Sequence, residues 1–175
     1  MTIARSALAL VAALALNLTA HAEEEIFSNP VVDIGIVVKD IEKSTKFYGE
    51  VLGLQKVGAF EVSAQMATDF GLTDNQPASV QVYALSKKEG ATKLKLMSFP
   101  NAQGKSSDQK FIHSTLGFSY LTLFVTDMDA AMERLKKAGV KTLGKTPGSL
   151  GGKNKLTVVR DPDGNFVELI GPSEK

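Results

Sequence analysis

Residues 33–54 read DIGIVVKDIEKSTKFYGEVLGL, and residues 120–140 read YLTLFVTDMDAAMERLKKAGV. The two stretches repeat one pattern of apolar, acidic and glycine positions at a constant spacing. The matches are Val38 with Val125, Asp40 with Asp127 and, after a slip of one residue, Gly53 with Gly139. Internal self-similarity of this kind predicts a fold built from two copies of one supersecondary unit.

Each copy has the pattern of a strand followed by a helix. Apolar residues at alternate positions, such as Ile34 and Ile36, are typical of a strand. Asp40 is placed to cap the next helix through its carboxylate, and Gly53 to end it, because glycine tolerates the left-handed conformation after a last turn. Asp127 and Gly139 have the same places in the second copy.

Further strands are expected after each helix. In the first copy they cover residues 54–63, 79–85 and 92–99, and in the second 140–143, 155–160 and 166–170. The turn Asp161-Pro162-Asp163-Gly164 separates the last two. Each copy is therefore predicted to be βαβββ, with a linker at residues 100–115. The loop at residues 64–78, with a short helix at 64–70, either covers a pocket or is a surface loop.

The N-terminus has the pattern of a secretory signal. Arg5 precedes an apolar run at residues 7–16, and Ala20-His21-Ala22 is a small-residue cleavage site. We expect cleavage after residue 22, which makes the protein exported, periplasmic or secreted. The alternative is an uncleaved anchor, although the run is too short to span a bilayer. A lipoprotein signal would need a cysteine, and the chain has none.

The composition narrows the classes of partner. The chain has 20 Lys and Arg and 19 Asp and Glu, so loss of Arg5 with the signal leaves no net charge. This balance argues against binding to nucleic acid, or to a membrane after cleavage. The absence of cysteine excludes disulfides and thiolate chemistry. The remaining chain is long enough to bury one core.

A tandem βαβββ repeat that ends in DPDGNFVELIGP, residues 161–172, resembles the glyoxalase/bleomycin-resistance/dioxygenase (vicinal oxygen chelate) superfamily. The resemblance covers about residues 31–172. It implies an α+β fold in which two repeats, about 31–99 and 116–172, form a curved mixed sheet shaped as a cup, with the helices outside. Residues 23–175 would then be one domain.

The resemblance also implies four metal-ligand positions in the cup, typically occupied by His, Glu or Gln, His and Glu. In this chain they are occupied by Asp33, Lys95, Tyr120 and Glu168, so only Glu168 matches. A protonated lysine has no lone pair and cannot bind a metal. We therefore expect no tightly bound metal and no other cofactor, although a weakly held divalent cation could use Asp33 and Glu168.

One hypothesis places the ammonium group of Lys95 where the metal would be, between Asp33 and Glu168, with Tyr120 alongside. The alternative is that these four are ordinary strand residues and that Lys95 reaches solvent. Secondary candidates for the cup are Gln81, Tyr83, Phe118 and Thr122. His21 leaves with the signal and His113 falls in the linker, so no catalytic residue is assigned.

Two classes of function remain open. The first is a binding protein that holds a small-molecule ligand in the cup, with a homodimer among the arrangements that the resemblance allows. The second is an enzyme, either a metal-dependent lyase or isomerase similar to lactoylglutathione lyase or a dioxygenase, using Glu168 with a divergent ligand set. The fold alone does not separate them.

Overall fold

A computed structural model of the protein describes residues 26–102 and 104–174. The chain has two compact units, residues 1–30 and 31–175. In the first unit, the described residues 26–30 form no helix or strand. The expected signal, residues 1–22, lies outside the described residues. None of the helices in the described ranges is long and apolar enough to cross a membrane.

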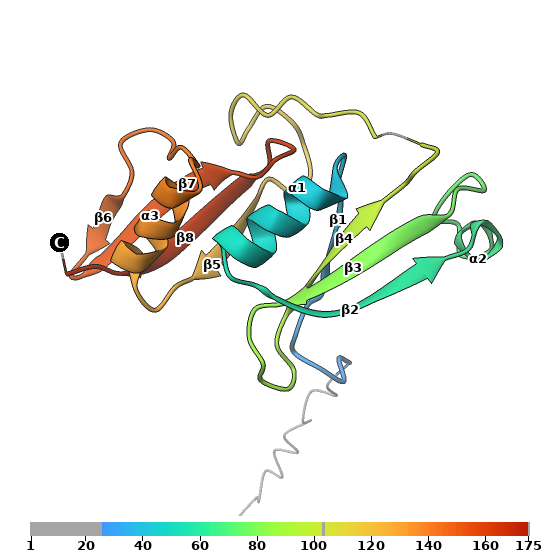
Figure 1. Ribbon diagram of the computed structural model, residues 1–175, viewed down its shortest axis with the longest axis horizontal. Helices are drawn as coiled ribbons and strands as arrows, with labels where there is room; N and C mark the ends of the chain where they lie inside the picture. Colours follow the sequence, from blue (N-terminus) through green and yellow to red (C-terminus); the bar gives the residue numbers. More distant parts are fainter. Residues whose placement is uncertain (1–25, 103, 175) are drawn as a thin grey trace, which may run out of the picture. The chain divides into compact units, whose positions relative to one another are not determined.

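The unit formed by residues 31–175 repeats one order of elements (Figure 1). In the first repeat this order is β1 (Ile34–Val37), α1 (Ile41–Thr45), its π-helical continuation η1 (Lys46–Val51), β2 (Gln55–Val62), α2 (Ala64–Asp69), β3 (Ala78–Ala84) and β4 (Lys93–Ser98). In the second it is β5 (Tyr120–Phe124), α3 (Met128–Lys137), β6 (Gly148–Gly151), β7 (Asn154–Arg160) and β8 (Phe166–Pro172). The predicted α+β class and the tandem βαβββ repeat are confirmed.

Each repeat forms its own four-stranded sheet, with the orders β1-β4-β3-β2 and β5-β8-β7-β6. The first and last strands of a repeat run parallel, and the remaining pairs are antiparallel. A parallel pair requires a long crossover, which the helix and the two middle strands supply. The identical topology of the two sheets puts equivalent residues of the repeats at equivalent places.

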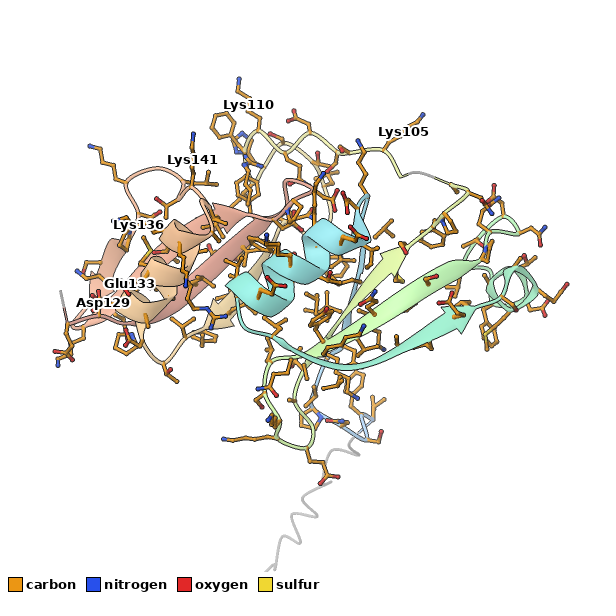
Figure 2. The ribbon with its side chains drawn as sticks, in the orientation of Figure 1. Lys105, Lys110, Asp129, Glu133, Lys136 and Lys141 are labelled. Atoms are coloured by element: carbon orange, nitrogen blue, oxygen red, sulfur yellow. The ribbon has the colours of Figure 1, made fainter. Side chains whose placement is uncertain are left out.

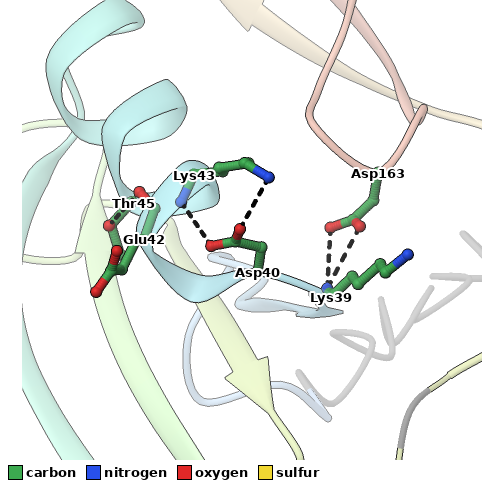
Figure 3. Close-up of polar contacts among 6 residues, drawn as sticks. All are labelled: Lys39, Asp40, Glu42, Lys43, Thr45 and Asp163. Carbon is green, nitrogen blue, oxygen red and sulfur yellow. Dashed lines mark hydrogen bonds and ion pairs between the residues drawn. The ribbon is translucent and has the colours of Figure 1, made fainter.

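The helices begin and end where the sequence predicts. The carboxylate of Asp40 accepts a hydrogen bond from the backbone N–H of Lys43 at 3.1 Å (Figure 3), and Asp127 accepts one from Ala130 at 3.0 Å. These caps satisfy N–H groups that have no partner within the helix. On α3 the charged side chains of Glu133 and Lys136 project outward (Figure 2), whereas Met128 and Leu135 are buried. An amphipathic helix covers a sheet in this way.

One strand was predicted in the wrong place. Residues 140–143 form no strand, and the edge strand β6 lies at Gly148–Gly151. The backbone N–H of Leu143 does bond to the carbonyl of Val158 at 2.8 Å, but its own carbonyl accepts the hydroxyl of Thr146 at 2.6 Å, which turns the chain away. The glycines at both ends of β6 gave no strand signal because glycine is a poor strand former.

A buried hydrogen bond joins the two repeats. Tyr48, on η1, is 0 % exposed, and its hydroxyl donates to Oδ2 of Asp161 at 2.8 Å. Burial is the main cause of a Tyr48 pKa well above the ordinary value, so the hydroxyl keeps its proton and donates it. Asp161 also accepts the backbone N–H groups of Asp163 and Asn165, at 3.0 and 2.8 Å. The turn before β8 is therefore fastened to the first repeat.

Two further contacts cross between the repeats. Both carboxylate oxygens of Asp163 accept from the backbone N–H of Lys39, at 3.3 and 3.2 Å (Figure 3). The guanidinium of Arg134, on α3, donates to the carbonyl of Glu50 at 2.5 Å. A Cβ at Gly53 would lie 2.8 Å from Nη1 of Arg134, and Gly53 has a φ of +88°. The positive φ therefore favours glycine at this position, and a Cβ there would displace the guanidinium of Arg134.

Tyr48→Phe should lower the free energy of unfolding by about 2 kcal/mol, because it removes a buried hydrogen bond to a charged carboxylate oxygen, which keeps only the side-chain N–H of Asn165. Tyr120→Phe is the matched control, since Tyr120 is exposed and no hydrogen bond of its hydroxyl is found among the described residues. Chemical denaturation of the three proteins measures both changes. Equal stability of Tyr48→Phe and Tyr120→Phe would show that the bond does not hold the repeats together.

Candidate ligand-binding faces

Each sheet has one face packed against helices and one face turned away from them. On the packed faces, Leu94 and Leu96 of the first sheet and Val167 and Leu169 of the second belong to one hydrophobic core. Because side chains alternate along a strand, their neighbours in sequence lie on the opposite faces. We call these opposite faces the first open face, on β1-β4-β3-β2, and the second open face, on β5-β8-β7-β6.

The first open face holds an ion pair. Nζ of Lys95, on β4, lies 3.1 Å from Oδ2 of Asp33, just before β1, and the two side chains are 36 % and 33 % exposed. The other carboxylate oxygen of Asp33 accepts the backbone N–H of Lys93 at 3.2 Å. The hydrogen bond from Lys95 is the largest effect on Asp33 and lowers the pKa of that carboxyl below its ordinary value. Asp33 is therefore oriented by two donors and stays ionised.

The middle of the first open face is largely apolar. Strand register aligns Gly35, Lys95, Val82 and Gly58 in one row across the four strands. The next row contains Val37, Met97, Val80 and Phe60. Val80 and Val82 are only 3 % and 8 % exposed although they lie on the side away from the helix, so neighbouring side chains cover them.

The second open face carries the other polar pair. The hydroxyl of Thr122, on β5, donates to Oε2 of Glu168, on β8, at 2.8 Å. Around this pair lie exposed aromatic side chains: Tyr120 is 54 % and Phe124 80 % exposed, and Phe118 just before the strand is fully exposed. Three exposed aromatic side chains close together on one sheet indicate an interaction surface.

Sequence reasoning missed two residues on the second open face. Register aligns Tyr120, Phe166 and Arg160 in the row next to Glu168. The guanidinium of Arg160 lies 4.2 Å from the centroid of the Phe166 ring and donates to the carbonyl of Gly164 at 2.8 Å. The sequence contained a signal for Arg160: it is next to the apolar Val159 on a predicted strand, so its side chain should lie on the opposite, open face.

The four predicted ligand-position residues therefore lie in two pairs on different sheets. Asp33 meets Lys95 on the first open face, and Tyr120 and Glu168 lie on the second, where Thr122 joins Glu168. Among the described residues, no ion pair joins Lys95 to Glu168.

The prediction that Gln81 and Tyr83 line the cup is wrong. Their register partners are Leu96 and Leu94, so both lie on the packed face, and Tyr83 is part of the core. The prediction took the polar residues of β3 as the cup-facing ones. The open face instead carries the apolar residues Val80 and Val82, which are aligned with Met97 and Lys95.

A cavity of about 420 Å³ adjoins the first open face at the end of β1. Val37 lies on the first open face and also lines the cavity. The other walls are formed by Phe99 and Pro100 after β4, by the linker at residues 104–107 and by Asp163. A volume of this size suits a small molecule.

The donor groups present do not fit the metal site that the resemblance implies. Asp33 and Glu168 are the carboxylates available, and they lie on different sheets. No group of three or more His, Cys, Asp or Glu side chains that could hold a metal ion is found in residues 26–102 and 104–174. Lys95, at the second ligand position, carries no lone pair while it is paired with Asp33.

Residues 30–169 match the family model of the Glyoxalase/Bleomycin resistance protein/Dioxygenase superfamily. Two βαβββ repeats, each with a helix-packed sheet, define the class of fold. The match over most of the chain assigns the particular family, and the protein belongs to this superfamily.

Proteins similar to this chain have names that describe different functions. The chain is 28 % identical to the lactoylglutathione lyase of Pseudomonas putida over 142 residues, which is 78 % of this chain and 81 % of that one. Its fold is similar to a glyoxalase family protein from Bacillus cereus, with a TM-score of 0.70, 20 % identity and coverage of 88 % and 99 % of the two chains. It is also similar to an antibiotic binding protein from Streptomyces, with a TM-score of 0.55, 23 % identity and coverage of 86 % and 100 %.

Lys95→Met should destabilise the isolated chain at neutral pH by less than about 1 kcal/mol, because the pair is one-third exposed and solvent screens it. The folded-state pKa of Asp33 is lowered, so the pair contributes above the ordinary Asp pKa of about 4 and its contribution is lost as the pH falls through the folded value. The difference between the two proteins should therefore be smaller at about pH 3 than at neutral pH.

Chemical denaturation of dilute protein at both pH values measures this difference. Lys56→Met is the control, because Lys56 is aligned with Tyr83 on the other side of the same sheet and has no described ion pair. A loss of stability in Lys95→Met that is the same at both pH values would show that Asp33 is not its partner in solution.

Proposed function

We propose that the protein is an exported member of its superfamily that binds a small molecule in a cup, without a tightly bound metal. The observation that carries this proposal is the ion pair between Lys95 and Asp33 at two positions where the superfamily resemblance places metal ligands. An ammonium group held there supplies the positive charge that a cation would supply. A metal would have to displace Lys95 from Asp33 and would find Tyr120 at a third position, a poor ligand unless it is ionised.

The cup is completed by a second copy of the chain. Within one chain, the Lys95 pair and the Glu168 pair lie on separate sheets, and the second open face exposes Phe118, Tyr120 and Phe124. If the first open face of one copy covers the second open face of another, the same contact recurs by two-fold symmetry and the assembly closes as a dimer. Both apolar faces are then removed from water.

Charge complementarity favours this partner over an unrelated one. The first open face carries Lys93 and Lys95 against the single carboxylate of Asp33. The second carries Glu168 and also Arg160, but the guanidinium of Arg160 is already held by the carbonyls of Gly164 and Lys110. Docking of the two faces brings Glu168 of the partner subunit toward Lys95. The ammonium would then lie between two carboxylates, as the sequence suggested, but the second carboxylate comes from the other copy.

Export rests on the N-terminal pattern of Arg5, the apolar run at residues 7–16 and the Ala20-His21-Ala22 site. The protein would therefore meet its ligand in the periplasm or outside the cell.

A metal-dependent lyase is the second candidate, and one observation favours it. The relative from Pseudomonas putida that matches 78 % of this chain is named lactoylglutathione lyase. Glu168 is the residue that such a function would retain as a ligand.

Metal analysis of the purified protein separates the two candidates. The binding proposal expects far less than one zinc, nickel or iron ion per chain after mild chelation. Glu168→Gln, prepared in the same way, should have the same metal content. A near-stoichiometric metal in the wild type that Glu168→Gln loses would contradict the proposal and support the lyase.

A further inference from the structure

A cleft with a cavity of about 340 Å³ lies between the two repeats. It is found where the end of η1 lies beside the end of β5 and the start of α3 (Figure 1). Leu85 lines it and is 45 % exposed, so part of its wall is in contact with water, and burial of that surface by a ligand would be favourable. The walls are mainly aliphatic and include Leu52, Leu54, Leu85, Leu123, Val125 and Leu169.

Arg134, on α3, brings a positive charge to one end of this apolar cleft. Its guanidinium lies over Gly53, which also lines the cleft, because a Cβ at Gly53 would be 2.8 Å from Nη1 and 3.0 Å from Nη2. Nη2 donates to the carbonyl of Glu50. No ion pair of Arg134 is found among the described residues. A guanidinium has five N–H donors, so donors remain for a ligand.

The acidic residue that lines the cleft, Asp127, lies at the opposite end of α3 from Arg134. Its carboxylate accepts the backbone N–H of Ala130 at 3.0 Å and caps the helix. Asp127 precedes Arg134 by two helical turns, about 10 Å along the helix axis. Between them the helix presents the small side chains of Ala130 and Ala131 to the cleft. The cleft therefore has a cationic end, an apolar middle and a carboxylate far from the cation.

We propose that this cleft binds an aliphatic monocarboxylate of the medium-chain fatty acid class. The guanidinium of Arg134 binds the carboxylate, since its planar fork matches two carboxylate oxygens. The hydrocarbon chain lies along Ala130 and Ala131 against the aliphatic side chains of η1 and β5. All residues of the site come from one chain, so this inference goes beyond the proposed function and does not depend on a second copy.

Butanoate, hexanoate and octanoate are the probes, and octanamide, which is neutral and of the same length as octanoate, is the control. Each added methylene should tighten binding by about fourfold until the cleft is filled. Octanamide should bind at least tenfold more weakly than octanoate. Calorimetric titration of the purified protein measures the affinities, and chemical-shift changes of the backbone amides at residues 52–54 and 123–127 locate the ligand.

Variants separate the charged end of the cleft from its apolar wall. Arg134→Gln should weaken octanoate at least tenfold and leave octanamide unchanged, and Arg134→Lys, which keeps the charge without the planar fork, should have an intermediate effect on octanoate. Lys137→Gln is the matched control, because Lys137 is exposed on the same helix and does not line this cleft. Leu85→Ser should weaken octanoate and octanamide equally, whereas Leu72→Ser, at an exposed leucine outside the cleft, should weaken neither.

Three results would overturn the inference. Equal affinity for octanoate and octanamide, or unchanged octanoate binding in both Arg134 variants, would remove the role of Arg134. An affinity that does not rise from butanoate to octanoate would show that no apolar cleft receives the chain. Chemical-shift changes on the open faces alone, unaffected by Leu85→Ser, would place the ligand in the cup instead of this cleft.

Discussion

The hydrogen bond from Tyr48 to Asp161 determines how the two repeats are arranged. It is buried, its acceptor also holds the turn before β8, and Asp163 in the same turn accepts from Lys39 at the end of β1. The packed faces of both sheets contribute side chains to one hydrophobic core, which also contains residues of η1 and α3. The opposite faces are what remains for binding. Because one face of each sheet forms the core, the residues of the opposite face can vary with function without loss of the fold.

The residues on the open faces differ from the metal ligands that the superfamily resemblance implies. Replacing a metal ligand with lysine brings a fixed positive charge to a place that would otherwise hold a metal ion. Asp33 is held by Lys95 and by the backbone of Lys93, so the pair is structurally satisfied without any metal. A cavity of about 420 Å³, which shares Val37 with the same face, lies at the end of β1.

Much of the fold could be predicted from the sequence because the repeat is encoded locally. Asp40 and Asp127 cap the helices, and Gly53 ends the first helix beside Arg134, as short-range patterns indicate. The edge strand β6 was missed because its contacts with β7 come from tertiary structure and its residues are poor strand formers. The candidate site was predicted in part. Asp33 and Lys95 are paired, but Tyr83 lies in the core, since a polar group on a strand does not reveal which face the fold buries.

The central claim is that Lys95 and Glu168 face each other only across two copies of the chain. Charge reversal tests it most directly, with sedimentation velocity as the measurement. Lys95→Glu alone and Glu168→Lys alone should each be monomeric, because each puts like charges opposite one another at both contacts. An equimolar mixture of the two should form a dimer, since every contact then joins a lysine to a glutamate. A mixture that stays monomeric, while one chain carrying both substitutions behaves as the wild type, would place the contact within a single chain and contradict the account.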